Sequence, residues 1–324
     1  MFRRALSSLL EHRQQKRGGR MRILLTGSSG WLGRALAPRL RTLGHDVTGL
    51  DPVPSSETRM VGSVADRDLV MRAVEENRIE AIIHSGALHK PDIEHHRNED
   101  FVETNVRGTL NLLDAAATFG VQRFIFTSTT SLMITQAIRA GLPGRAAWLT
   151  EDMSPEPRNI YGVTKLAAEH LCRLYHIQFG LPVIVLRTAR FFPEADDMAH
   201  VIEQSDANTK ANELLFRRLT VEDAADAHIA ALEKAPQLGF DTFIISAPTP
   251  FQPDDCAALI ADAPSIVARY FPDYPALYLK KGWTMFSSID RVYDASRARD
   301  RLDFVCKTSF ADVLAGLEAE ENGA

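Results

Sequence analysis

The sequence predicts an α/β fold in which a doubly wound parallel sheet carries a smaller C-terminal substrate lobe. Three observations lead to this prediction. Short apolar runs alternate with helical patterns up to residue 187, as in a parallel sheet buried on both faces. A glycine-rich turn joins the first apolar run to the first helix. After residue 187 the alternation breaks, which marks the start of a second lobe.

The first strand–turn–helix–strand unit is the clearest part of the pattern. Residues 22–26 are predicted to form a buried strand. A helix over 31–43 follows, because its leucines recur at spacings of four, four and three. Gly44 then ends the helix, and residues 46–50 form a second strand that ends at Asp51. The unit has about 30 residues, which is the length of a βαβ unit.

The same alternation continues along the chain, and right-handed crossovers then produce the doubly wound order. The remaining predicted helices cover 66–77, 98–119, 159–179 and 221–232, and the remaining strands 81–84, 123–127, 182–186 and 242–246. We predict a dinucleotide-binding domain over 21–187 that also receives elements from 219–247. The substrate lobe is predicted to comprise residues 188–218 and 248–324.

The composition is that of an ordinary globular protein. The chain has 324 residues, of which 45% are hydrophobic and 24% charged, with a formal net charge of −5. This excludes disordered and fibrous chains, and the absence of a basic patch in the body argues against nucleic-acid binding. No stretch has the apolar length of a membrane span. Three distant cysteines fit free thiols in a reducing compartment, so we expect a cytoplasmic protein.

Residues 1–20 differ in charge from the rest of the chain. They carry +5, which leaves −10 for the remaining residues. An arginine- and serine-rich leader is typical of a targeting presequence, and equally of a disordered extension or of a start assigned too early, with Met21 as the true start. We expect a disordered leader that takes no part in the site.

The glycine-rich turn has the spacing and the context of a dinucleotide site. Gly27, Gly30 and Gly33 lie between a predicted strand and a predicted helix. Such glycines allow a tight turn, close approach of the backbone to a pyrophosphate, and close packing of helix on strand. The free N–H groups of the helix then face the phosphates. Asp51 follows 18 residues after Gly33, where a carboxylate accepts the ribose hydroxyls, so we predict NAD rather than NADP.

Tyr161 and Lys165 are the candidate catalytic pair. They lie four residues apart at the start of a predicted helix, hence on one face of it. An ammonium near a phenol favours the phenolate and lowers its pKa. Such a tyrosine exchanges a proton with a substrate hydroxyl or carbonyl.

Taken together, the ordered motifs resemble the extended short-chain dehydrogenase/reductases, and most closely their NAD-dependent epimerase/dehydratases, which have a Rossmann-type fold. The resemblance covers about residues 21–250. It is carried by the segments Thr26–Gly33, Thr104–Thr109, Phe124–Thr130 and Tyr161–Lys165. Val221–Asp223 and Arg291–Asp294 also look like later family segments.

The resemblance implies a role for each motif position. Tyr161 would be the acid/base, and Lys165 would hold the nicotinamide ribose and depress the pKa of Tyr161. Thr129 would hydrogen-bond the reacting oxygen, with Ser128 as the alternative register. Asn105 would support a relay to Lys165; its residue type alone indicates only a polar residue in a helix.

The resemblance also completes the expected cofactor site. Ser63 replaces an acidic residue that the family usually has near the adenine. The predicted cofactor contacts are Gly27, Gly30, Trp31, Leu32, Gly33, Asp51, Ser63, Val64, Ser85, Gly86, Ala87, Thr127 and Lys165.

The predicted substrate contacts depart from the nucleotide-sugar pattern. Arg190 stands where the family usually has an asparagine, and Phe216 stands where it has an arginine, with Arg217 next. These departures argue against a UDP-sugar. Arg190 is suited to pair with a phosphate or carboxylate of the substrate, or with Glu194 or Asp197. The candidate substrate residues are Ser128, Thr130, His89, Arg190 and Arg217.

His89, His95 and His96 lack the spacing of a metal site, so we expect no metal. His89 is instead expected to border the substrate pocket.

We therefore expect an NAD-dependent epimerase/dehydratase-type enzyme that acts on a hydroxyl of a sugar or sugar nucleotide. The alternatives are an NAD-dependent sugar or alcohol dehydrogenase with net redox change, and a non-catalytic dinucleotide-binding regulator. The expected partner is a small carbohydrate-like molecule. The family commonly dimerises through two helices per chain, so the helices at 98–119 and 159–179 predict a homodimer, with Leu110, Leu113, Leu166 and Leu171 as candidate contacts.

Overall fold

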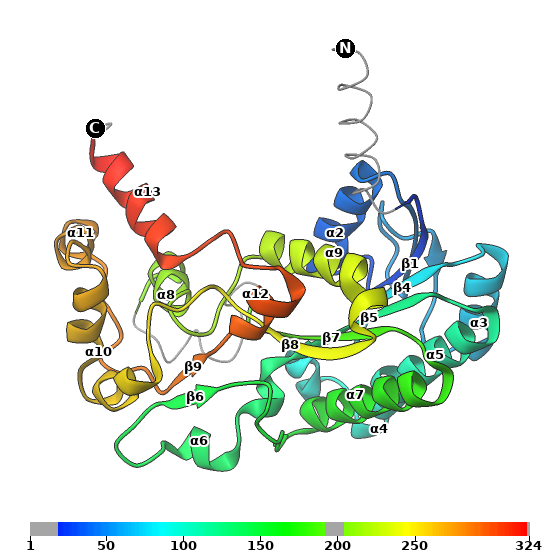
Figure 1. Cartoon of the computed structure of the whole chain (residues 1–324), viewed down its shortest axis with the longest axis horizontal. Helices are drawn as coiled ribbons and strands as arrows, with labels where there is room; N and C mark the ends of the chain where they lie inside the picture. The colour runs from blue at the N-terminus through cyan, green and yellow to red at the C-terminus, as the bar shows by residue number, and fades with distance from the viewer. Residues whose placement is uncertain (1–18, 192–203, 323–324) are drawn as a thin grey trace, which may run out of the picture.

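A parallel sheet forms the centre of the protein. The computed structural model describes residues 19–191 and 204–322 (Figure 1). Within them, seven parallel strands form a sheet of order β3-β2-β1-β4-β5-β7-β8. These strands are β1 (Arg22–Thr26), β2 (Asp46–Asp51), β3 (Met60–Val61), β4 (Ala81–His84), β5 (Arg123–Thr129), β7 (Val183–Thr188) and β8 (Phe240–Ile245). The predicted doubly wound fold is confirmed.

Helices cover both faces of this sheet (Figure 1). The helices are α2 (Trp31–Thr42), α3 (Arg67–Glu76), α4 (Asn98–Phe101), α5 (Gly108–Phe119), α6 (Gln136–Ala140), α7 (Ile160–Phe179), α8 (Asp206–Glu213), α9 (Val221–Leu238), α10 (Cys256–Tyr270), α11 (Tyr274–Lys281), α12 (Ser296–Leu302) and α13 (Phe310–Asn322). Helices α2 and α9 pack on one face and enclose one apolar core. Helices α3, α5 and α7 pack on the other face and enclose a second core.

The order of the strands places a crevice between β1 and β4. Successive strands run outward from β1 to β3 on one side and from β4 to β8 on the other. Ligands of open α/β sheets bind outside the carboxyl ends of the strands at such a reversal. The glycine-rich turn follows β1, and the loop that begins at Ser85 follows β4. The sheet therefore brings the two predicted cofactor segments together.

Local capping sets the start and the end of α7. The side chain of Asn159 accepts a hydrogen bond from the backbone N–H of Gly162, as an N-cap does. Gly180 ends the helix with a φ of 66°, which a residue without Cβ adopts readily. Tyr161 consequently lies in the first turn of α7, beside the carboxyl end of β5.

Three differences between the structure and the sequence predictions concern the sheet, its helices and the two short paired strands. The helix predicted over 98–119 is interrupted by a π-helical turn over Val102–Arg107, between α4 and α5. Helix α9 extends to Leu238 rather than ending at residue 232. The strands β3, β6 (Ala147–Leu149) and β9 (Arg291–Tyr293) were not predicted, because two or three residues are too few for a periodic signal.

A third core lies under α8, α10, α11 and α13, which gather on one side of the molecule in Figure 1. The strands β6 and β9 pair in parallel and border it. Ala146, at the start of β6, belongs to this core, so a segment from within the first 187 residues packs there. The division into 21–187 and the later lobe remains a prediction.

The following statements hold for the described residues, 19–191 and 204–322. Among them, no helix has the length and apolar character needed to cross a membrane. The leader falls outside them up to residue 18, as do Glu194 and Asp197, the predicted partners of Arg190.

Candidate active site

The glycine-rich turn between β1 and α2 is sterically intolerant of side chains. Gly27 has a φ of 72°, and a Cβ there would lie 2.7 Å from the backbone nitrogen of Gly86. A Cβ on Gly33 would lie 2.2 Å from the carbonyl oxygen of Gly27. At Gly30 the nearest atom would be 3.4 Å away, because that residue faces open space. Two glycines therefore let the chain segments touch, and the third leaves the cleft open to a ligand.

Asp51 ends β2 at the far side of this cleft. Its Oδ2 accepts a hydrogen bond from the backbone N–H of Ser29 at 3.1 Å, and its Oδ1 accepts one from the N–H of Val53 at 2.8 Å. These bonds orient the carboxylate and leave lone pairs free for further donors. A carboxylate that is held in this orientation can accept hydrogen bonds from both hydroxyls of a ribose.

The loop after β4 closes the cleft. The hydroxyl of Ser85 donates to the carbonyl of Thr26 at 2.7 Å, and the N–H of Gly86 donates to the Thr26 hydroxyl at 3.1 Å. The cleft has a volume of about 800 Å³, which suits a dinucleotide. The predicted residues that line it are Gly27, Gly30, Trp31, Leu32, Asp51, Ser63, Val64, Ser85, Gly86, Ala87 and Thr127.

These features fit NAD. The open face at Gly30, the N-terminus of α2 and the Asp51 carboxylate lie along one cleft. Of the remaining predicted cofactor residues, Gly33 is buried beneath the turn, and Lys165 lines the adjoining catalytic pocket.

The Asp51 carboxylate should make the protein discriminate against NADP. A 2′-phosphate would place a dianion beside it, and like charges repel each other. We expect NADP to bind about 10- to 100-fold more weakly than NAD, and Asp51→Ser to reduce that difference, by calorimetric titration. Asp46→Asn, at the exposed opposite end of β2, is the control. Tighter binding of NADP than of NAD to the unmodified protein would contradict this prediction.

Tyr161 and Lys165 meet in a second pocket that adjoins the cleft. This pocket has a volume of about 140 Å³ and contains Thr129 as well. The Thr129 hydroxyl is hydrogen-bonded to Tyr161 and lowers its pKa, but burial outweighs this effect and raises the pKa of Tyr161 to about 12. The expected lowering by Lys165 is absent in this structure. Tyr161 is therefore protonated at neutral pH in this structure.

The side chain of Lys165 contacts an aromatic ring beside the pocket. Its Nζ lies 4.1 Å from the ring centroid of Phe126, a cation–π contact. Burial lowers the pKa of Lys165 to about 8, although the neighbouring Glu169 and Cys172 raise it. The ammonium is therefore still protonated at pH 7, although it is poorly solvated. A hydrogen bond to a ligand oxygen would compensate for part of the solvation that it has lost.

Asn105 lies in the π-helical turn and is 2% exposed. Its Nδ2 donates to the Thr164 hydroxyl and to the Leu88 carbonyl, each at 3.0 Å. Its Oδ1 accepts from the N–H of Leu88 at 2.8 Å. The side chain therefore ties the loop after β4 to α7, next to Lys165. π turns are frequent at functional sites.

Ser128 and Thr130 line the catalytic pocket but turn their hydroxyls to the protein. The Ser128 hydroxyl donates to Glu169 Oε1 at 2.5 Å. The Thr130 hydroxyl donates to the carbonyl of Thr188 at 3.4 Å. Thr129, between them, is the residue of this segment that is bonded to Tyr161.

A buried ion pair behind the pocket was not predicted from the sequence. Arg187 donates to both oxygens of Glu169, at 3.0 and 2.8 Å, and both side chains are less than one-tenth exposed. With Ser128 they join β5, β7 and α7 at the edge of the site. The signal for it was the spacing, since Glu169 follows Lys165 by four residues on the same helix face.

An arginine cluster lines the other wall of the catalytic pocket. Arg190, Arg217 and Arg291 all line it. Arg217 pairs with the fully buried Glu213 at 2.5 Å, and Arg190 lies 3.8 Å from the same carboxylate. Strand-like pairing between residues 190 and 218 brings the two segments together. Arg291 and the nearby Tyr293 were not predicted as site residues, although the segment Arg291–Asp294 resembles a segment of the family.

His89 lies where the cofactor cleft and the catalytic pocket meet. Its ring centroid is 5.7 Å from that of Tyr161. Burial and the Lys165 charge lower the pKa of His89 to about 4, so the imidazole is neutral at pH 7. Over the part of the chain that the structure describes, no cluster of histidine, cysteine and carboxylate side chains could hold a metal ion.

Comparison with known proteins supports one family. The family model of the NAD dependent epimerase/dehydratase family matches residues 23–243. The chain is 30% identical over 208 residues to a UDP-glucose 4-epimerase of Corynebacterium glutamicum, covering 62% of this chain and 59% of that protein. It is 30% identical over 181 residues to a uronate dehydrogenase of Pseudomonas syringae pv. tomato, covering 53% of this chain and 60% of that protein.

Among solved structures, a UDP-glucose 4-epimerase from Thermotoga maritima, crystallised with UDP-glucose, superposes with a TM-score of 0.63 at 21% identity. It covers 89% of this chain and 94% of that chain. At this identity the likeness concerns the fold. The two curated relatives are matched over about three-fifths of their lengths, so the substrate has to be argued from the site itself.

Proposed function

The chain belongs to the NAD-dependent epimerase/dehydratase family, and from this premise we propose that it oxidises a hydroxyl of an anionic sugar by hydride transfer. The observation that carries the proposal is the pairing of a buried Tyr161, hydrogen-bonded to Thr129, with an arginine-lined wall in one small pocket. The first feature suits proton transfer at a hydroxyl, and the second suits a carboxylate or phosphate.

The protein residues divide the work between proton transfer and positioning. Oxidised NAD, when bound, would supply the hydride acceptor and a positive charge that favours the phenolate. Tyr161 takes the hydroxyl proton through its phenol oxygen, and Thr129 orients the reacting oxygen. Lys165 would hold the nicotinamide ribose and supply positive charge. His89, neutral and beside Tyr161, is placed to exchange a hydrogen bond with the substrate.

The arginine wall supports an anionic substrate. Among the described residues, the guanidinium groups of Arg190, Arg217 and Arg218 all lie within 4 Å of the Glu213 carboxylate. Arg291 adds a further guanidinium, paired with Asp290. Burial and the neighbouring Arg190 charge lower the pKa of Arg218 to about 9. Guanidinium groups that line a pocket suit a carboxylate or phosphate of a ligand.

The size of the pocket favours a sugar acid over a nucleotide sugar. Its volume of about 140 Å³ is well below the range of roughly 300–1,000 Å³ typical of pockets for larger ligands. Net oxidation of such an acid is the activity named for the Pseudomonas syringae relative. The second candidate is epimerisation of a nucleotide sugar, which the likeness to the Corynebacterium glutamicum epimerase supports.

A substrate panel separates these functions. We expect a hexuronic acid with NAD to produce absorbance at the NADH band, and UDP to bind weakly or not at all in a thermal-shift assay. Arg217→Ala should lower kcat/KM for the acid by about 10- to 100-fold, since charge-assisted hydrogen bonds contribute about 1.5–3 kcal/mol. Arg107→Ala, which removes an exposed guanidinium paired with Glu103, should have no effect.

The other outcomes are equally definite. Tight UDP binding, with interconversion of UDP-sugars and no accumulation of NADH, would establish the epimerase and overturn the sugar-acid substrate. Binding of NAD without turnover of any sugar, nucleotide sugar or sugar acid would favour the non-catalytic regulator.

We also propose a cytoplasmic homodimer. Of the predicted contacts, Leu113 is buried in the second core, while Leu110 and Leu171 are partly buried against it and Leu166 is partly buried against the first. Apolar side chains of α7 and the π turn remain exposed, and we propose that these form the interface: Val102, Val163, Leu174 and Ile177. The three cysteines are buried free thiols, as suits a reducing compartment.

A further inference from the structure

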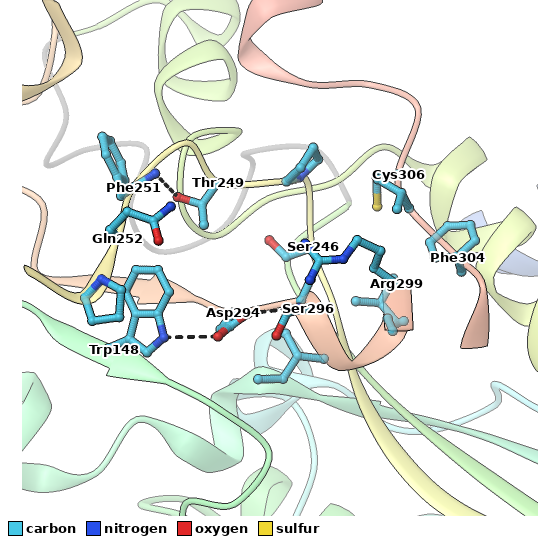
Figure 2. Close-up of a pocket in the computed structure, with 17 residues that line it drawn as sticks. Trp148, Ser246, Thr249, Phe251, Gln252, Asp294, Ser296, Arg299, Phe304 and Cys306 are labelled. Atoms are coloured by element: carbon cyan, nitrogen blue, oxygen red, sulfur yellow. Dashed lines mark hydrogen bonds between the residues drawn. The ribbon is translucent and has the colours of Figure 1, made fainter. Parts of the chain in front are cut away.

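A separate cavity lies where β8 ends, between the loop that leads to α10 and helix α12. Its volume is about 360 Å³. Figure 2 shows Trp148 of β6 on one side of it and Phe304 and Cys306 on the other, with Ser246 between them. Its walls come from three stretches that are distant in the sequence, so the cavity exists only in the folded chain.

This cavity is distinct from both pockets of the active site. None of its lining residues lines the cofactor cleft or the catalytic pocket. The adjacent residues Tyr293 and Asp294 line the catalytic pocket and this cavity respectively. The end of β9 is therefore a wall between the two, with a different environment on each side.

An indole that is held in place forms one wall. The Nε1–H of Trp148 donates to Asp294 Oδ2 at 3.1 Å, and β6 pairs with β9 beneath it. Phe251, which is buried, adds a second aromatic surface. A rigid aromatic face pays little entropy on binding and packs well against apolar C–H surfaces.

Polar groups lie beside this aromatic face. Asp294 Oδ1 accepts from the N–H of Ser296 at 2.9 Å, so both carboxylate oxygens are positioned and each keeps acceptor capacity (Figure 2). The hydroxyl of Ser246 donates to the carbonyl of Arg218 at 3.3 Å and is free to accept. The Thr249 hydroxyl accepts from the N–H of Phe251 at 3.3 Å and is free to donate.

The charge of the cavity excludes the ligand class proposed for the active site. Arg299 lines the cavity, but its guanidinium is paired with Asp300 at 2.7 and 3.2 Å. Asp294 remains as an acidic group facing the cavity. An anionic sugar would therefore be repelled here, whereas a neutral one would not.

We propose that this cavity is a second carbohydrate site, which binds a neutral pyranoside. A pyranose ring has one apolar C–H face, which suits Trp148, and hydroxyls around its edge, which suit Asp294, Ser246 and Thr249. The volume of about 360 Å³ accommodates one or two such rings. This site is independent of the reaction proposed above, because no residue is shared.

The test uses methyl β-D-glucopyranoside, a neutral sugar with no free anomeric hydroxyl, and the full-length protein saturated with NAD. We expect saturable binding at one site per chain by calorimetry or saturation-transfer NMR. Thr249→Trp fills the mouth of the cavity and should weaken binding at least 10-fold. Leu279→Trp places the same side chain at an exposed position of α11 and should not. Tyr161→Phe should also leave binding unchanged.

Other results would overturn the proposal. Absence of saturable binding, or equal binding by the Thr249→Trp variant, would do so. Loss of binding in Tyr161→Phe alone would place the sugar in the catalytic pocket instead. The part of glucuronate binding that Thr249→Trp removes should be at least 5-fold weaker than the corresponding binding of the neutral glycoside. The reverse order would show that Asp294 does not face the ligand. Tighter binding of uridine than of the glycoside would indicate an aromatic ligand class. Thermal unfolding of each variant shows that the fold is intact.

Discussion

Tyr161→Phe is expected to abolish nearly all turnover while NAD binding stays within about 2-fold of the unmodified protein. The substitution removes the one phenol that Thr129 hydrogen-bonds in the catalytic pocket. It leaves the cofactor cleft untouched, since Tyr161 does not line it. General acid–base catalysis contributes about 10²- to 10⁴-fold, so kcat should fall by that amount, measured with the sugar found active in the panel.

Tyr175→Phe is the matched control. Tyr175 lies on the same helix, is also buried, and hydrogen-bonds Asp114 rather than any pocket residue. Its loss should leave kcat within about 3-fold, because a hydrogen bond to the Asp114 carboxylate contributes roughly 1.5–3 kcal/mol to stability rather than to the reaction. Full activity of Tyr161→Phe would remove this residue from the mechanism.

Glu169→Ala is expected to have the largest effect on stability. It leaves the guanidinium of Arg187 buried and without its carboxylate partner. The Nη1 of Arg187 already has no hydrogen-bond partner. Removing one partner of a buried pair costs about 3–5 kcal/mol, so the melting temperature should fall by about 6–20 °C for a chain of this size.

The double variant Glu169→Met, Arg187→Met tests the cause. Replacing both charges with apolar side chains removes the unpaired ion, so most of the stability should return. If the double variant were as unstable as Glu169→Ala, lost packing rather than an orphaned charge would explain the effect. The Ser128 hydroxyl loses its acceptor in both variants. A loss of activity common to both would therefore indicate that Thr129, the next residue, is no longer held in position.

The sequence predicted those elements whose signal lies within a short stretch of the chain. The first βαβ unit and α7 follow from apolar periodicity and from capping by Asn159 and Gly180. The glycine-rich turn and Asp51 were placed correctly in one cleft because a parallel sheet brings the carboxyl ends of its strands to one edge.

Features that depend on distant segments could not be predicted. The strands β6 and β9 have three residues each and pair across more than a hundred residues of chain. The Glu169–Arg187 pair joins helix α7 to strand β7. In the sequence, α7 has the pattern of an ordinary amphipathic helix and β7 that of an ordinary buried strand, so neither indicates the pair. The pKa of Tyr161 was predicted in the wrong direction, because desolvation by the surrounding fold outweighs the neighbouring groups.

The π-helical turn at Val102–Arg107 sets a limit on redesign of this protein. Such a turn contains one residue more than an α-helical path would use. Deleting that residue would make an unbroken α-helix from α4 to α5, and would change the direction of the side chains within the former turn. Asn105 would then lose Thr164 and Leu88. An engineer who idealised this helix for stability would therefore disconnect the cofactor loop from the catalytic helix, so the irregularity has to be kept.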